Sequence, residues 1–233
     1  MKKINLVSYN LTKLTIDNEI YSIFDGVANF GGKINLNCCS IDLDTDLAYE
    51  KLLSEAVERV VFYNLRDLNI FSTTTGFSAH SNKINSIENS CYELKERFYN
   101  YKIRNDPRYQ PVIIINNINS KTFIYQFEKE LFHAITQFEY RGVSGWGASV
   151  SPIIDLAYKK SRLEAIMMSN SYEVCNRRGN AISCLASTYN ILDENYEIID
   201  HGRWTIMGRE RYVTQAIIKE GRVKLEVRHK PPN

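Results

Sequence analysis

The sequence lacks the features that would place it on a membrane or on nucleic acid. No apolar run approaches the roughly 20 residues that a membrane span needs, and the first residues lack the apolar stretch of a secretory signal. Lys and Arg number 29 against 27 Asp and Glu, so there is no broad basic field of the kind that binds nucleic acid. We therefore expect a cytoplasmic protein that binds neither partner.

The cysteines and histidines also lack the spacing of disulfide or metal frameworks. The five cysteines are an odd number without a CxxC pair, and the adjacent Cys38 and Cys39 suit neither a disulfide framework nor a zinc knuckle. We expect them to be reduced and mostly structural. The histidines are scattered without metal-ligand spacing, which favours core or surface roles: His80, His133, His201 and His229.

No Walker loop of the form GxxxxGK[ST] is present, which argues against a P-loop enzyme. The 233 residues are 44% hydrophobic and can bury a full core. We expect a mixed α/β (α+β) fold forming a single domain over 1–233, or two intimately packed halves.

The N-terminal part of the chain has the pattern of strands followed by a helix. Strands are expected over 4–30, with a turn at Asp25-Gly26, and over 34–41. A helix is expected over 46–64. Four residues before it are candidates for its N-cap: Asp42, Asp44, Thr45 and Asp46.

Three segments rich in glycine or small hydroxyl residues suggest loops that could approach a phosphate. Gly31-Gly32-Lys33 places a lysine beside two glycines, a pattern that is most often only a turn. Residues 70–82 begin like a strand and continue in small hydroxyl residues. Residues 141–152 form a third such loop, feeding a helix over 152–171 that carries Glu164.

The remaining elements are predicted with less detail. A helix over 86–102 should end at Asp106-Pro107, and 111–118 should be a buried strand. Residues 122–135 fit a strand or a helix, and the pattern does not decide between them. Strands are expected over 196–204 and in a final hairpin over 211–228 that turns at Glu220-Gly221. The arginines of this region fit a solvated hairpin face: Arg203, Arg209, Arg211, Arg222 and Arg228.

Two predicted helices each carry a pair of glutamates three residues apart. Glu55 and Glu58 share one helix face, as do Glu93 and Glu96. Like charges at this spacing repel, so each pair should face water or share a cation. Exposed salt-bridge faces explain such pairs as well as a site does. If the helices face one another, the four carboxylates could hold one or two magnesium ions bridged by ATP, because Mg²⁺ binds carboxylate and phosphate oxygens.

Each pair has an arginine beside it that could neutralise a transferred phosphoryl group. These are Arg59 in the first helix and Arg97 in the second.

Taken in order, these segments resemble the YcaO family. The resemblance covers about residues 20–170 and rests on the two ExxER helices. The segments that resemble the family are Gly31-Gly32-Lys33, Leu53-Ser54-Glu55-Ala56-Val57-Glu58-Arg59, Ser72-Thr73-Thr74-Thr75-Gly76-Phe77-Ser78-Ala79-His80, Glu93-Leu94-Lys95-Glu96-Arg97, Ser144-Gly145-Trp146-Gly147-Ala148-Ser149 and Arg162-Leu163-Glu164-Ala165. Residues 180–233 would form a strand and hairpin region of the same domain.

The resemblance implies an enzyme that uses ATP and Mg²⁺ to phosphorylate a backbone amide oxygen of a peptide. A nucleophile would then displace phosphate, giving an azoline, a thioamide or an amidine. It also implies a role for several residues of this chain. Glu55, Glu58, Glu93 and Glu96 would bind magnesium, Arg97 and Arg59 would act on the phosphate, and Lys33, Ser78, Ser81, Asn82 and Glu164 would line the nucleotide site.

The expected partners are a peptide substrate and a second protein that delivers the substrate or sulfur, with a homodimer as one option. Two alternatives remain open. The chain could be a catalytically degenerate YcaO-like scaffold that binds a peptide or another subunit. It could also be a plain α/β binding domain with exposed glutamate faces.

Overall fold

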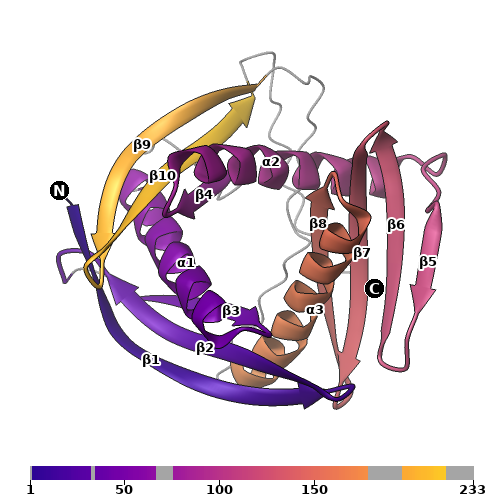
Figure 1. Cartoon of the computed structure of the whole chain (residues 1–233), viewed down its shortest axis with the longest axis horizontal. Coiled ribbons are helices and arrows are strands. Elements are labelled where there is room, and N and C mark those ends of the chain that lie inside the picture. The colour runs from indigo at the N-terminus through magenta and orange to yellow at the C-terminus, as the bar shows by residue number, and fades with distance from the viewer. Residues whose placement is uncertain (1, 33–34, 67–75, 178–195, 219–233) are drawn as a thin grey trace. The chain divides into compact units, whose positions relative to one another are not determined.

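The computed structural model describes residues 2–32, 35–66, 76–177 and 196–218. The chain forms two compact units, Met1–Glu93 with Ile198–Ile217 and Leu94–Glu197 with Ile218–Asn233. The described residues contain two sheets and three helices, so the expected mixed α+β class is confirmed (Figure 1). None of these helices is long and apolar enough to cross a membrane.

The first unit is built on a six-stranded sheet in the order β3-β2-β1-β9-β10-β4, covered by helix α1 (Figure 1). Its elements are β1 (Lys2–Ile16), β2 (Glu19–Asn29), β3 (Leu36–Asp42), α1 (Thr45–Arg66), β4 (Phe77–His80), β9 (Tyr196–Ile206) and β10 (Arg209–Ile218). Buried side chains of α1 recur at helical spacing and pack on the sheet: Leu52, Leu53, Ala56, Val57, Val60 and Val61. This apolar stripe explains why the segment is a helix and which face it buries.

The helices begin where the sequence offers a cap. Asp44 Oδ1 accepts hydrogen bonds from the N–H groups of Asp46 (2.8 Å) and Leu47 (3.0 Å), so Asp44 is the N-cap of α1. Helix α2 (Lys83–Asn105) is capped by Asn82, whose Oδ1 accepts the Ile84 N–H at 2.8 Å. It ends directly before Asp106-Pro107, as predicted.

The turn predicted at Asp25-Gly26 is wrong, because both residues lie inside β2. The hairpin turns instead at Asp17 and Asn18, whose φ values of 50° and 65° fit a tight two-residue turn. Gly26 is needed for packing, since a Cβ there would lie 3.2 Å from both Cys38 Sγ and Leu52 Cδ1. Glycine thus marks the close approach of α1 and β3 to β2.

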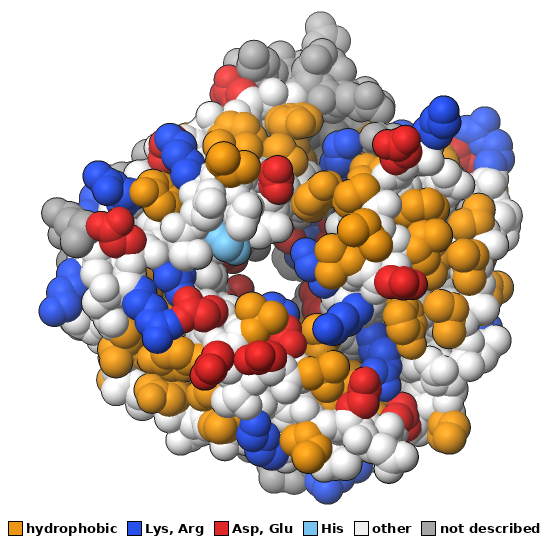
Figure 2. Space-filling view, in the orientation of Figure 1, with side chains coloured by type: hydrophobic (Ala, Val, Ile, Leu, Met, Phe, Trp, Pro, Cys, Tyr) orange, Lys and Arg blue, Asp and Glu red, His pale blue; other side chains and the backbone are white. Residues whose placement is uncertain are grey.

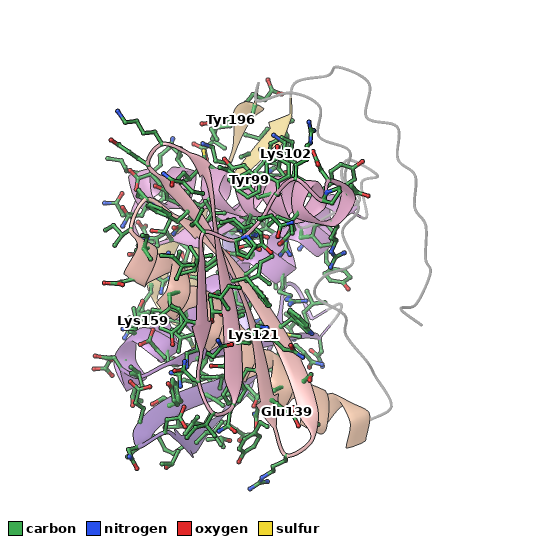
Figure 3. All side chains as sticks on the ribbon, turned by 90° about the vertical axis from the view of Figure 1, so that its right-hand side faces the viewer. Tyr99, Lys102, Lys121, Glu139, Lys159 and Tyr196 are labelled. Atoms are coloured by element: carbon green, nitrogen blue, oxygen red, sulfur yellow. The ribbon has the colours of Figure 1, made fainter. Side chains whose placement is uncertain are left out.

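The second unit contains a four-stranded sheet in the order β5-β6-β7-β8, with α3 packed on it (Figure 3). Its elements are β5 (Ile113–Asn116), β6 (Ser120–Glu128), β7 (Leu131–Tyr140), β8 (Val143–Ser151) and α3 (Ile154–Arg177), together with the second half of α2. Residues 122–135, which fitted a strand or a helix, belong to the β6–β7 hairpin. In Figure 3, Lys121 and Glu139 lie on this sheet.

The prediction that 111–118 is buried is wrong, although the strand itself exists. β5 is the edge strand of the sheet, and Ile114 is 49% exposed. A run of β-branched residues favours a strand without specifying its place in the sheet, because an edge strand uses the same backbone conformation.

The third glycine-rich loop is also a wrong prediction, because most of it is strand β8. A Cβ on Gly145 would lie 2.1 Å from Ala165 O, and one on Gly147 would lie 2.2 Å from Ser161 O. The glycines therefore let α3 approach the sheet closely. The only turn in this segment is Arg141-Gly142, with φ values of 51° and 76°.

Of the C-terminal hairpin predicted over 211–228, the described residues include only the first strand. β9 and β10 are neighbours in the sheet and are joined at Met207 and Gly208, both with positive φ. The predicted strand beginning at Arg211 corresponds to β10. The predicted turn at Glu220-Gly221 and the strand after it lie outside the described residues.

Three of the described cysteines form no disulfide, in line with the expected reduced state: Cys38, Cys39 and Cys91. Burial, with a smaller contribution from the nearby Glu55 charge, raises the pKa of the Cys38 thiol to about 12. Cys38 is therefore an unreactive core side chain at neutral pH.

His133 is a fully buried histidine of the second unit. Its Nε2 donates to Asn100 Oδ1 at 2.9 Å, and Tyr99, Tyr125 and Phe127 surround the ring. Burial, together with the positive charge of Arg97, lowers its pKa to about 3. The imidazole is therefore neutral in the folded protein at physiological pH.

This burial predicts a loss of stability in acid. A depressed pKa means that the unfolded chain takes up the proton first, so the stability that His133 contributes is complete above the unfolded pKa of about 6.5 and falls as the pH drops toward 3. At pH 5 the loss should be about 2 kcal/mol. Urea unfolding from pH 7 to 5 should therefore show a flatter profile for His133→Gln than for the parent. Equal slopes would contradict the assignment.

Candidate functional site

Two glutamates of α1 project from the same helix face. Glu55 Oε1 pairs with Arg59 Nε at 2.6 Å, one helical turn away. Both side chains remain partly exposed, so this pair contributes little to stability by itself. The ion pair holds the Arg59 guanidinium beside Glu55 and near Glu58. A guanidinium in this position could neutralise the charge of a phosphate bound there.

Glu58 lies deeper and is linked to strand β4. Its Oε1 accepts the backbone N–H of Ala79 at 2.7 Å. Burial and the negative charges of Glu55 and Glu93 raise its pKa well above the usual value, and the Ala79 N–H only partly offsets them. The surroundings of Glu58 therefore disfavour its ionised form, and perturbed pKa values of this kind are common at functional sites.

Glu93 belongs to the first unit and lies close enough to Glu58 to raise its pKa. Three glutamates of the first unit thus interact electrostatically. The raised pKa of Glu58 differs from the unperturbed value expected of an exposed carboxylate in a plain binding domain.

Glu96 and Arg97 belong to the second unit. They are three and four residues beyond Glu93 in α2, which places Glu96 on the same helix face as Glu93. Glu96 is 8% exposed, and its Oε1 lies 3.6 Å from Arg97 Nη1. Whether the carboxylates of α1 meet Glu96 stays a prediction.

Within the described part of the chain, no group of three or more His, Cys, Asp or Glu side chains is arranged to hold a metal ion. The electrostatic influence of Glu55 and Glu93 on Glu58 therefore reflects proximity rather than a closed set of ligands. Magnesium commonly binds through one or two carboxylates together with phosphate oxygens, so fewer protein ligands suffice.

The residues expected to line a nucleotide have varied surroundings. Ser78 is buried in β4, paired with Thr214 of β10, rather than in the expected loop. Ser81 and Asn82 are exposed and follow β4; the Ser81 hydroxyl lies 3.4 Å from His80 Nδ1, which accepts the Asn82 N–H at 3.1 Å. Lys33 lies outside the described residues.

Glu164 binds backbone in the second unit. Its Oε2 accepts the N–H of Ala148 in β8 at 2.8 Å. α3 thus presents Glu164 to a strand, much as α1 presents Glu58 to β4. In both cases a helix carboxylate satisfies the N–H of an alanine in a strand.

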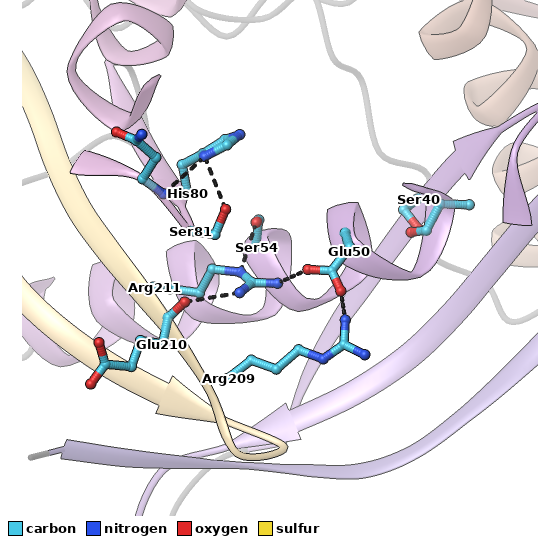
Figure 4. A network of polar contacts seen from close by, with 10 residues as sticks. Ser40, Glu50, Ser54, His80, Ser81, Arg209, Glu210 and Arg211 are labelled. Atoms are coloured by element: carbon cyan, nitrogen blue, oxygen red, sulfur yellow. Dashed lines mark hydrogen bonds and ion pairs between the residues drawn. The ribbon is translucent and has the colours of Figure 1, made fainter. Parts of the chain in front are cut away.

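A polar cluster around Arg211 was not predicted, since the arginines of the C-terminal strands were expected on a solvated face. The Arg211 side chain is 2% exposed; its Nε donates to Ser54 Oγ at 3.2 Å, and its Nη2 contacts Glu50 Oε2 (Figure 4). Arg209 pairs with the other Glu50 oxygen. The alternation of β10 could have suggested an inward position for Arg211, but its partners on α1 could not be inferred locally.

Comparison with solved structures identifies the fold: this chain has a YcaO-like fold. The YcaO from Methanopyrus kandleri bound with AMPPCP and Mg²⁺ superimposes with a TM-score of 0.66 and 11% identity, covering 92% of this chain and 85% of that one. The E. coli microcin synthetase McbBCD complex gives a TM-score of 0.59 at 11% identity, covering 89% and 87%. The same complex with pro-MccB17 bound gives 0.60 at 11%, covering 90% and 87%. No family model and no curated protein sequence matches.

Proposed function

We propose that the protein is an ATP- and Mg²⁺-dependent enzyme that activates a backbone amide of a peptide. The main support is the Glu58 carboxylate, whose pKa is raised by burial and by the charges of Glu55 and Glu93, in a YcaO-like fold. Folds of this kind occur with AMPPCP and Mg²⁺ bound in one structure and with a pro-peptide bound in another.

The donor set fits magnesium. Carboxylate oxygens are the ligands of a hard cation, and a cation beside Glu58 would relieve the repulsion that raises its pKa. Glu55, Glu58, Glu93 and Glu96 are the residues proposed to hold it. When bound, the ion would neutralise charge on the phosphates of ATP.

The remaining site residues would position the nucleotide. Arg59, already held by Glu55, and Arg97, beside Glu96, would stabilise the charge of the transferred phosphoryl group. Lys33, Ser81 and Asn82 would contact the nucleotide directly. Ser78 and Glu164, which lie in or against strands, would support the surrounding backbone.

The reaction proposed is transfer of the γ-phosphoryl group of ATP to the amide oxygen, with release of ADP. A nucleophile then attacks the amide carbon, and phosphate leaves. A neighbouring Cys, Ser or Thr side chain would give an azoline, sulfide a thioamide, and an amine an amidine. The peptide and a partner protein delivering it or sulfur would meet the enzyme in the cytoplasm, where ATP is available.

Nucleotide binding provides the first test. Isothermal titration with a non-hydrolysable ATP analogue should show binding in the presence of Mg²⁺ and a loss of at least about tenfold in affinity with EDTA, since the ion neutralises both partners. Equal affinity with and without Mg²⁺ would contradict the proposed metal site.

A non-catalytic scaffold is the second candidate, favoured by one observation. Glu55 already has an internal cation partner in Arg59. Absence of both nucleotide binding and ATP turnover, combined with binding of a peptide or second subunit, would support this candidate instead.

A further inference from the structure

Strand β1 has a long edge that no strand of the described residues pairs with. On one side it pairs with β2 from Asn5 to Ile16, but on the other it pairs with β9 only over Lys2–Ile4. Among the described strands, none pairs with the rest of that second side. We call this side of residues 5–16 the β1 edge. The backbone N–H and C=O groups along an open edge can form hydrogen bonds with an added strand.

The surface beside the β1 edge is partly apolar. Val7, Tyr9 and Leu11 are 53%, 47% and 45% exposed. Figure 2 shows hydrophobic side chains exposed along the course of β1. Large apolar side chains exposed together beside an open edge are typical of an interaction surface.

The β1 edge has little to prevent pairing with itself. Many proteins prevent an edge strand from pairing with another chain by placing charges or proline along it. Residues 5–16 contain no proline and one charged residue, Lys13. The Lys13 ammonium is already engaged by Ser22 Oγ at 2.6 Å and Thr45 Oγ1 at 2.5 Å. A bulge between Leu6 and Ser8 ends the regular strand on one side.

From these observations we infer that the β1 edge pairs antiparallel with the β1 edge of a second copy of this chain. The regular stretch runs from Ser8 to Ile16, and its midpoint is Thr12. A two-fold axis at Thr12 pairs the whole stretch without reaching the part of β1 that β9 occupies. Thr12 then faces its own copy, and Lys13 faces Leu11, so no like charges meet.

Charge substitutions at Thr12 test this arrangement, because the side chain is exposed and lies on the axis. The parent protein should be dimeric in sedimentation velocity at micromolar concentrations. Thr12→Lys and Thr12→Asp should each weaken the dimer about tenfold or more, since like charges then face one another. An equimolar mixture of the two variants should dimerise again. Ile20→Lys is the matched control, because Ile20 is also exposed but its strand lies on the other side of β1, where Ile20 pairs with Thr15, and it should behave as the parent.

A monomeric parent, including one that gains only a peptide on this edge, would overturn the inference. So would a dimer that survives both Thr12 variants. If those variants do not fold, Leu11→Glu provides a second test. The introduced carboxylate would face Lys13 of the other copy and strengthen the dimer. An unchanged or weaker dimer would overturn the inference. Neither readout requires nucleotide, so the outcome is separable from that of the proposed activity.

Discussion

Replacing Glu58 with glutamine is expected to abolish ATP turnover while making the folded protein more stable. The proposed site loses a carboxylate that holds Mg²⁺, and losses of about 100-fold or more in kcat are typical when an electrostatic group of a site is removed. Stability should rise, because the raised pKa means that the surroundings disfavour the charged form. Glutamine keeps an oxygen that can accept the Ala79 N–H.

The pH dependence gives this prediction a definite sign. A raised carboxyl pKa contributes stability that is complete below the unfolded pKa near 4.5 and is lost as the pH rises through the folded pKa. In the absence of Mg²⁺, Glu58→Gln should therefore melt higher than the parent at pH 7, by about 2–4 °C for a gain of about 1 kcal/mol. The two should melt together near pH 4.

The matched control for Glu58→Gln is Glu88→Gln, an exposed carboxylate on α2. It should change neither ATP turnover nor the melting temperature appreciably. Full Mg²⁺-dependent turnover in Glu58→Gln would contradict the proposed function. A lower melting temperature at pH 7 would contradict the electrostatic account of Glu58.

Replacing Arg211 with methionine should have the largest effect on folding. The guanidinium is buried against Ser54 and Glu50 of α1, and its nearly complete burial lowers its pKa. Methionine preserves bulk but removes hydrogen bonds from a charged group, each of which is worth about 1.5–3 kcal/mol. We expect the free energy of unfolding to fall by about 2–4 kcal/mol in urea titrations, on the same basis.

Arg209→Met is the control for Arg211, because Arg209 pairs with the same Glu50 carboxylate from a half-exposed position. An exposed ion pair contributes about 0–1 kcal/mol, so the loss should be small. If both variants lost the same stability, burial of Arg211 would not be the cause. A near-neutral Arg211→Met would show that the cluster does not hold β10 to α1.

The helices could be predicted closely because their signals are local. The predicted range 46–64 lies within α1 (Thr45–Arg66), and Asp44 was among the expected caps. The end of α2 at Asp106-Pro107 follows from the proline itself. In each case the deciding atoms lie within one or two turns of the helix end.

The glycine-rich segments show where local reasoning failed. Gly145 and Gly147 suggested a loop, but they lie in β8 because α3 passes too close for a side chain. Gly26 suggested a turn and lies in β2 for the same kind of reason. A glycine that admits a neighbouring element is indistinguishable, in sequence, from a glycine that turns the chain.

The sequence by itself determined the three helices, the Asp44 cap of α1 and the two glutamate pairs with their arginines, because each depends on residues a few positions apart. Only the tertiary structure decided that Glu58 lies beside Glu55 and Glu93, that Arg211 is buried against α1, and that no described strand pairs with the second side of β1 beyond Ile4. Burial and proximity of residues far apart in the chain depend on which elements pack together. Burial and proximity change the pKa of a carboxylate and the exposure of a strand, and neither can be predicted from the neighbouring residues in the sequence.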